Sequence, residues 1–461
     1  MTTEAITTAA GVPESINPYR ELKGARQVLF ALGHLGPGAL AQFITVWLLL
    51  YLSGGEPIIL SASLVGTALL TSTIIDAVAD PIVANWSDRY HHSKYGRRLP
   101  FIIGGTLPMI IAFVMVWLTG YISPSVVWRF IWVAFWLKIF YFTYTIVVNP
   151  YFALLPEIAP TKKQRSFIQS FVALFGILGM GFALGASGFL IAHFGHIVSA
   201  IIMGVFCALV MIGPMLTIRI NPQADVEQLE PGSRNIFISI KDAFGNLAFR
   251  NYIIGFCIFF LGFQLIQYNL AFFTTVLLEL DTGMSSLLFI SSVVSGVALI
   301  PVYNIFLRKM TNINALKMAV FSFAIIAVLI ALTPVLHTFI NGTALGFALM
   351  ILLGFPYSGL MVIPNILISE IIDEDKAIHH KAREALFFGV QGLINKFMVA
   401  LAAFAVGVIL DMFGNTIEQP YGVRLIAPLA AVTAIVGYLV LRRSNLGLAT
   451  AGPVSVEQQE E

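Results

Sequence analysis

The sequence predicts an all-α polytopic membrane protein with twelve transmembrane helices in two six-helix halves. Of its 461 residues, 58% are hydrophobic and 11% are charged, whereas a soluble domain has roughly a quarter charged residues. The apolar runs reach the ~20 residues that a membrane-spanning helix needs, and they exceed the roughly ten-residue strands of a membrane β-barrel. Positive charge alternates between successive loops, as in a chain that crosses a membrane repeatedly. These observations exclude an ordinary soluble enzyme.

Apolar runs bounded by polar or Gly/Pro-containing segments define the candidate helices. The expected spans are about 25–52, 58–87, 100–121, 125–156, 166–193, 196–219, 248–279, 284–308, 313–334, 340–371, 384–413 and 421–442. A polar segment with Pro222 and Gly232 separates the sixth span from the seventh. We therefore expect an N-tail at 1–24, an N-terminal bundle at 25–220, a linker at 221–247, a C-terminal bundle at 248–443 and a C-tail at 444–461.

The lysines and arginines test this helix count independently of hydropathy, because they collect in cytoplasmic loops. Of the 26 such residues, 22 fall in the two tails and in the loops after even-numbered spans, and only Arg424 falls in an opposite loop. The other three, Arg129, Lys138 and Lys396, fall inside spans. A miscount by one helix would destroy this pattern, so we expect both termini in the cytoplasm. The first 18 residues contain no lysine or arginine and do not read as a signal peptide, in agreement with a cytoplasmic N-terminus. We expect a multi-pass protein of the cell membrane, inner or plasma.

Other features limit the partners that the chain is expected to have. A net charge of +2 without a clustered basic face argues against nucleic acid. Cys207 and Cys257 lie in separate apolar runs and form neither a disulfide framework nor a metal motif. Because no Gly-rich loop with a Lys-Ser/Thr ending is present, ATP drive is not indicated and no cofactor is expected. We expect a monomer, since a fold of this size encloses its whole path in one chain.

Two carboxylates in the second span carry a large free-energy cost of insertion into a membrane. Asp76 and Asp80 are four residues apart, which places both on one helix face. Each charge near mid-bilayer costs roughly 2.5–3.5 kcal/mol, and the two repel each other, so the pair requires a cation. The alternative is that both residues form hydrogen bonds with a neighbouring helix or cap the following loop.

Lys396 in the eleventh span is the matching positive charge. It is expected to neutralise the carboxylates when no ion is bound and to be released when one arrives, which would couple ion and solute; the alternative is a static ion pair. The hydroxyl of Thr145 in the fourth span lies at a depth where it could complete an oxygen cage for Na⁺, because hard cations prefer oxygen ligands. Its alternative is a hydrogen bond to its own helix.

Neutral polar and aromatic side chains in other spans are candidates for a solute site. They are His34, Tyr141, Gln264, Tyr268 and Tyr357. For His34, a structural hydrogen bond is the competing interpretation. For the polar face of the seventh span, the competing interpretation is contact between helices.

Several motifs together resemble one transporter family. They are Asp76-Ala-Val-Ala-Asp80-Pro81, Asp88-Arg89, Tyr95-Gly-Arg-Arg-Leu-Pro100, Tyr144-Thr-Ile146, Pro150-Tyr-Phe-Ala-Leu-Leu-Pro156 with Arg165, the Asp373–Arg383 loop and Lys396. The chain resembles the glycoside–pentoside–hexuronide:cation symporters of the major facilitator fold. The resemblance covers both halves and implies a cation site at Asp76, Asp80 and Thr145, with Lys396 in the coupling network.

The chain departs from the family pattern at informative positions. The residue before the second aspartate can be a polar cation ligand in the family, and here it is Ala79, so the choice between Na⁺ and H⁺ stays open. The galactoside-binding members use charged residues at positions that Gly38, Val148 and Ala173 occupy here. We therefore do not expect a galactoside held by the same charged contacts. Animal lysolipid carriers share the acidic pair and the lysine.

These features lead to one main hypothesis and two alternatives. We expect symport of a small organic solute, such as a sugar, glycoside or uronate, with Na⁺ or H⁺ by alternating access. A lysolipid or amphiphile transporter on the same fold is the first alternative. A Mg²⁺-dependent membrane prenyltransferase is the remote one, and it would need a second acidic motif, for which Asp373–Asp375 is the candidate. Basic and acidic residues near the loops are expected to brace a cytoplasmic gate, or else only to orient the chain. They are Asp88, Arg89, Arg97, Arg98 and Glu157.

Overall fold

The computed structural model describes residues 19–55, 57–90, 96, 98–218, 236–379 and 383–443. Most of the predicted tails and linker, and the candidate gate residue Arg97, lie outside these ranges. The first half contains α1 (Ala25–Ala31), η1 (Leu32–His34), α2 (Leu35–Ser53), α3 (Ala62–Arg89), α4 (Leu99–Trp117), α5 (Thr119–Ile122), α6 (Val126–Ala153), α7 (Leu155–Ile158) and α8 (Lys162–Thr217). The second half contains α9 (Ile236–Gly245), α10 (Leu247–Phe272), η2 (Phe273–Leu277), α11 (Thr282–Leu307), α12 (Asn312–Ala331), α13 (Thr333–Leu336), α14 (Gly342–His379), α15 (Glu384–Phe413) and α16 (Tyr421–Arg443).

The α8 segment contains two membrane spans. Eleven helices in the described part of the chain are long and apolar enough to cross a membrane, but one of them, Lys163–Thr217, has 55 residues. At 1.5 Å per residue it would extend far beyond a hydrocarbon layer of about 30 Å. Its backbone leaves the helical region at Gly195, where φ is 72° and ψ is 173°, a conformation that glycine adopts without strain. The helix breaks there, between the predicted spans 166–193 and 196–219, and the count of twelve is consistent with the structure.

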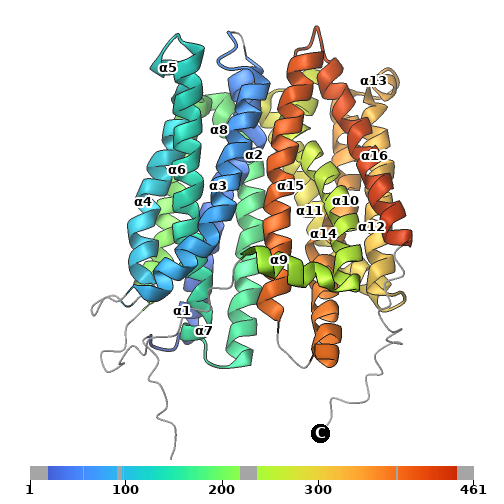
Figure 1. Cartoon of the computed structure of the whole chain (residues 1–461). Helices are drawn as coiled ribbons and strands as arrows, with labels where there is room; N and C mark the ends of the chain where they lie inside the picture. The colour runs from blue at the N-terminus through green and yellow to red at the C-terminus, as the bar shows by residue number, and fades with distance from the viewer. Residues whose placement is uncertain are drawn as a thin grey trace, which may run out of the picture.

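The long helices lie side by side and form two bundles, with the two ends of the described chain toward the same end of the molecule (Figure 1). We call this the basic end, because Arg89, Arg98 and Arg383 lie there, and the opposite end the far end. The helix α9 lies in the segment predicted as a linker and packs against α10 and α15. The first span is interrupted by η1, whose Gly33 packs so closely that a Cβ would lie 2.2 Å from Cγ of Pro214.

A carboxylate from the second half caps a helix of the first half at the far end. The α3 helix begins after Ser61, whose side chain makes no capping hydrogen bond. Instead, Asp411 of α15 accepts hydrogen bonds from the backbone N–H groups of Ala62, at 2.7 Å, and Ser63, at 2.8 Å. A negative charge at a helix N-terminus satisfies free donors and interacts favourably with the helix dipole. This interaction, the Asp411 cap, joins the two halves.

A second contact between the halves lies where α8 meets α11. The backbone N–H of Gly188 donates to Oγ of Ser286 at 2.7 Å, and the Thr282 hydroxyl donates to the Gly188 carbonyl at 3.1 Å. A Cβ at Gly188 would lie 1.9 Å from the Thr282 carbonyl oxygen, so only glycine allows this approach. The two halves are therefore closed against each other at the far end.

Candidate functional site

The predicted acidic pair and the predicted lysine meet between the two halves. Asp76 and Asp80 lie one turn apart on α3, and Lys396 extends from α15 of the other half. The Lys396 Nζ atom is 2.8 Å from Oδ2 of Asp76 and 2.7 Å from Oδ2 of Asp80. Asp76 is buried, whereas the side chain of Asp80 is 36% exposed. Both carboxylates therefore have a cation between them, and that cation is a side chain of the opposite half.

The α6 helix supplies a neutral polar group to each carboxylate. The Thr145 hydroxyl donates to Oδ1 of Asp76 at 2.5 Å, and Nδ2 of Asn149 donates to Oδ1 of Asp80 at 3.1 Å. Thr145 thus uses its hydroxyl on the acidic pair and not on its own helix. Asn149 was not among the predicted cation ligands. Its position four residues after Thr145 is the signal that places it on the same helix face.

The charges of this cluster explain what it can do. With Asp76, Asp80 and Lys396 ionised, two negative charges face one positive charge, so the cluster keeps a net charge of −1. The groups facing Lys396 carry oxygen atoms, which suit a hard cation such as Na⁺. Removing one member of a buried ion pair leaves an uncompensated charge and is strongly unfavourable. An ion that displaces the ammonium group would leave the cluster with the same net charge. Release of the lysine without such an ion would leave two carboxylates uncompensated.

Some predicted solute residues lie near the acidic pair. Tyr141 is buried and lies within electrostatic range of Asp76 and of Tyr268 from the second half. Tyr268 itself is buried on α10. Gln264, one turn before Tyr268 on α10, is half-buried. Side chains of both halves thus meet beside the cation cluster.

His34 and Tyr357 occupy two other places. His34 lies in the first half, where its Nδ1 atom is 3.2 Å from the Val172 carbonyl and its ring packs edge-on against Phe152. His34 thus contacts groups of its own half. The Tyr357 hydroxyl contacts the Met180 sulfur at 2.9 Å, across the halves, and Tyr357 lines a small cavity with Gln267. The structure does not bring His34 into contact with the acidic pair.

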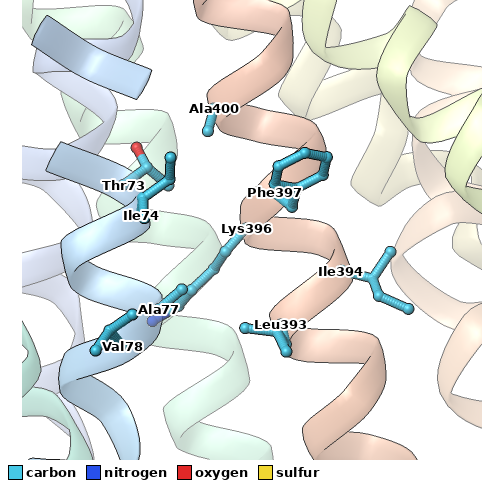
Figure 2. A pocket seen from close by; sticks show the side chains of 9 residues that line it. All are labelled: Thr73, Ile74, Ala77, Val78, Leu393, Ile394, Lys396, Phe397 and Ala400. Carbon is cyan, nitrogen blue, oxygen red and sulfur yellow. The ribbon is translucent and has the colours of Figure 1, made fainter. Parts of the chain in front are cut away.

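An apolar cavity of about 310 Å³ lies between α3 and α15, beside the lysine. Its lining residues are Thr73, Ile74, Ala77, Val78, Leu393, Ile394, Lys396, Phe397 and Ala400. Figure 2 shows the Lys396 side chain crossing this space from α15 toward Ala77 of α3. Because Val78 is 55% and Phe397 is 52% exposed, the cavity opens at the surface of the bundle. The opening is lined mostly by apolar side chains.

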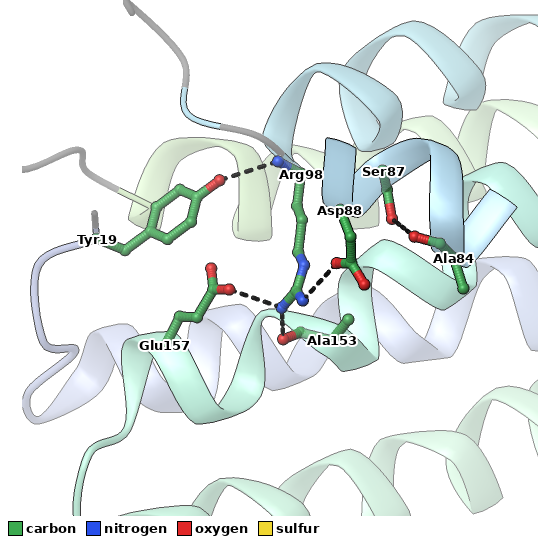
Figure 3. A network of polar contacts seen from close by, with 7 residues as sticks. All are labelled: Tyr19, Ala84, Ser87, Asp88, Arg98, Ala153 and Glu157. Carbon is green, nitrogen blue, oxygen red and sulfur yellow. Dashed lines mark hydrogen bonds and ion pairs between the residues drawn. The ribbon is translucent and has the colours of Figure 1, made fainter. Parts of the chain in front are cut away.

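Most of the predicted gate residues form a network at the basic end of the first half (Figure 3). The Arg98 guanidinium contacts Asp88 at 2.8 Å and Glu157 at 2.9 Å, and it donates to the Ala153 carbonyl. Tyr19 accepts a hydrogen bond from the Arg98 backbone, and burial raises the pKa of Tyr19, so its hydroxyl stays protonated. Arg98 thus ties α3, α4 and α7 together. Arg89 lies at the end of α3, near this network.

Replacing Arg98 is expected to destabilise the first half. The Arg98→Ala variant removes the ion pairs of Arg98 with Asp88 and with Glu157, whose side chain is 11% exposed, and we expect the free energy of unfolding to fall by about 3 kcal/mol. Arg98→Lys should recover little of this, because a single ammonium group cannot reproduce the planar fork of a guanidinium group. Thermal unfolding of the purified protein measures the loss, with the exposed Arg443→Ala as control. An unchanged unfolding temperature for Arg98→Ala would reduce the role of Arg98 to orienting the chain.

The second half has a similar network at its own basic end. Arg383 pairs with Asp375 through two nitrogens, and Asn246 donates to the same carboxylate at 3.3 Å. Asp375 is therefore neutralised by a neighbouring arginine in its own half and does not face Asp76. The second acidic motif that a diphosphate-binding prenyltransferase would need is not opposed to the first.

Comparison with known proteins gives matches over most of the chain. The family model described as MFS/sugar transport protein matches residues 29–447. A sodium-dependent lysophosphatidylcholine symporter of Gallus gallus is 22% identical over 84% of this chain and 78% of its own length. YagG of Escherichia coli, whose name assigns it provisionally to glycoside/cation symport, is 26% identical over 76% of this chain and 75% of its own length. A symporter of Synechocystis is 33% identical, over 33% of this chain and 28% of that protein.

The solved structures give the same architecture. A mutant of the nucleoside transporter NupG superposes with a TM-score of 0.69, covering 91% of this chain and 99% of that chain. Its sequence is 14% identical, so this likeness concerns the fold alone.

Proposed function

Because the chain belongs to the MFS/sugar transport protein family, we propose that it is a cation-coupled symporter that works by alternating access. The family and the transporter relatives support a transport protein rather than an enzyme. The observation that carries the proposal is the contact of Lys396 with both Asp76 and Asp80, because it joins the two halves through the charges that an ion would neutralise.

The coupling follows from competition for the two carboxylates. A cation that enters from one side of the membrane takes the place of the Lys396 ammonium group between Asp76 and Asp80. The lysine then no longer ties α15 to α3, and the two halves can move relative to each other. The ion is cargo in this scheme, and its downhill movement supplies the energy for the solute.

A small polar solute is the first substrate class. Neutral hydrogen-bonding groups beside aromatic rings come from Tyr141, Tyr268 and Gln264, and Tyr141 lies one turn before Thr145 on α6. These groups suit the hydroxyls of a sugar, glycoside or uronate. The assignment of YagG to glycoside/cation symport supports the same class. His34 is not needed for it, since His34 contacts the Val172 carbonyl within the first half.

A lysolipid is the second candidate, and one observation favours it. The cavity between α3 and α15 is mostly apolar, opens at the surface of the bundle and is crossed by the Lys396 side chain. An acyl chain fits an apolar cavity of this kind, and the chicken relative is named for lysophosphatidylcholine transport. Sugars and lysolipids are distinguished by their chemistry, because burial in an apolar cavity stabilises an acyl chain but not the hydroxyl groups of a sugar.

The deciding experiment is ligand-induced thermal stabilisation of the purified protein. A ligand that binds the folded state raises the unfolding temperature by mass action. A panel of sugars, glycosides, uronates and lysophosphatidylcholine, each with Na⁺ and at low pH, identifies the solute class, and uptake into proteoliposomes under a cation gradient confirms transport. We expect stabilisation by one class, and stronger stabilisation in the presence of the coupling ion. No response to any solute or ion, together with no gradient-driven uptake, would overturn the proposal.

A further inference from the structure

The helices α3 and α6 carry two polar pairs in matching register. One pair is Asp76 with Thr145 and the other is Asp80 with Asn149, and both join residues 69 positions apart. The partners within each helix are four residues apart, which is about 6 Å along the axis. The second pair therefore repeats the first one turn further along the two helices. If the Thr145 hydroxyl is a cation ligand beside Asp76, the Asn149 amide has the matching position for a cation ligand beside Asp80.

The Asn149 amide carries an oxygen atom that a metal cation can use as a neutral ligand. Asparagine carries a carbonyl oxygen and an NH₂ group on one planar unit, and a half-turn about its terminal bond exchanges the two. In this structure the NH₂ group donates to Asp80, which also accepts from Lys396. After the exchange, the same residue offers a neutral oxygen ligand.

No side chain between the two aspartates of α3 supplies a neutral oxygen ligand. Between the two aspartates, the residue beside Asp80 is Ala79, which is 2% exposed and has no side-chain oxygen. The α3 helix thus contributes two carboxylates, and the neutral ligands come from α6. Two carboxylates with one hydroxyl and one amide oxygen make a ligand set of oxygen atoms only, which is what Na⁺ prefers.

We propose that Asn149 is a ligand of the coupling cation and that this cation is Na⁺. The inference rests on the proposed function, because it assumes that an ion replaces the Lys396 ammonium group at Asp76 and Asp80. It adds the identity of the ion and a residue that selects it.

Titration of the purified full-length protein with NaCl tests this, with choline chloride keeping the ionic strength constant. The unfolding temperature is measured for the wild type and for Asn149→Leu, which removes the oxygen at similar size, and Asn149→Asp, which keeps an oxygen. We expect Asn149→Leu to need about tenfold more Na⁺ for half-maximal stabilisation, equivalent to ~1.4 kcal/mol. Asn149→Asp should keep the Na⁺ response. If Asn149 acts only as a hydrogen-bond donor to Asp80, Asn149→Asp should lose the response, because a carboxylate cannot donate. Thr143→Ala is the control on the same helix, because the Thr143 hydroxyl donates to the Ile139 carbonyl.

The outcomes separate this inference from the proposed function. If Na⁺ stabilises the wild type and Asn149→Leu equally, but not Asp76→Asn, the assignment of Asn149 is wrong and the cation site remains. If Na⁺ has no effect and a proton gradient alone drives uptake, the choice of Na⁺ is wrong and symport remains. If neither ion acts in binding or uptake, both proposals fail. The unfolding temperature without Na⁺ shows whether each variant is folded.

Discussion

The Asp76→Asn variant is expected to lose gradient-driven solute accumulation by more than about a hundredfold, while it still folds and inserts. Without the Asp76 charge, Lys396 and Asp80 form a neutral pair, and an ion that displaced the ammonium group would face one carboxylate instead of two. The ion then has no reason to bind, and its gradient cannot be used. Asp80→Asn should act in the same direction. Uptake into proteoliposomes under an inward cation gradient measures the effect.

A matched control keeps this result specific. Asp281 is another aspartate next to a membrane span, but it accepts from the backbone N–H of Met284 within its own helix. Asp281→Asn should accumulate solute like the wild type. Full accumulation by Asp76→Asn would show that the acidic pair is structural and would remove the cation site from the mechanism.

The Lys396→Met variant is expected to change the Na⁺ response in the opposite direction. Two carboxylates one turn apart then lack their shared ammonium group, and the free energy of unfolding in Na⁺-free buffer should fall by about 3 kcal/mol. Added Na⁺ should restore more stability than it gives the wild type, because it no longer competes with a tethered cation. Thermal unfolding with and without Na⁺, at constant ionic strength, measures both effects. Coupled accumulation should be lost, since ion binding no longer frees a link between the halves.

A double variant tests the reason for this destabilisation. Asp76→Asn combined with Lys396→Met removes one charge of each sign, and its stability in Na⁺-free buffer should be closer to the wild type than that of Lys396→Met alone. Lys138→Met, in α6, controls for the loss of an intramembrane lysine. If Lys396→Met and the wild type respond to Na⁺ alike, the lysine and the ion do not compete for the same oxygens.

The fold and the centre of the site follow from the cost of polar groups in lipid. Hydropathy and the alternation of lysines and arginines predict twelve spans, and the break at Gly195 falls between two predicted helices. The same cost predicts that Asp76, Asp80 and Lys396 must find one another, and the structure brings them together. The family resemblance read from these motifs is confirmed by the family match over residues 29–447.

Other site residues depend on how neighbouring helices are rotated and aligned, which one helix does not reveal. Asn149 contacts Asp80 only because α3 and α6 pack in a particular register. His34 lies in a glycine-rich part of the first span, but the contacts of its ring come from other helices of the first half. Asp411 is exposed near a helix end, and its sequence position does not distinguish it from an ordinary surface carboxylate.

The Asp411 cap gives the proposed transport cycle a built-in directional bias. Opening the far end must withdraw this carboxylate from the Ala62 and Ser63 amides, and loss of a helix cap costs about 0.5–2 kcal/mol. Since ~1.4 kcal/mol is a tenfold change in an equilibrium constant, the cap alone makes the far-open state of the empty protein several-fold rarer. Solute arriving from that side therefore binds with an apparent affinity reduced by the same factor, and entry and exit across the membrane proceed with unequal kinetics.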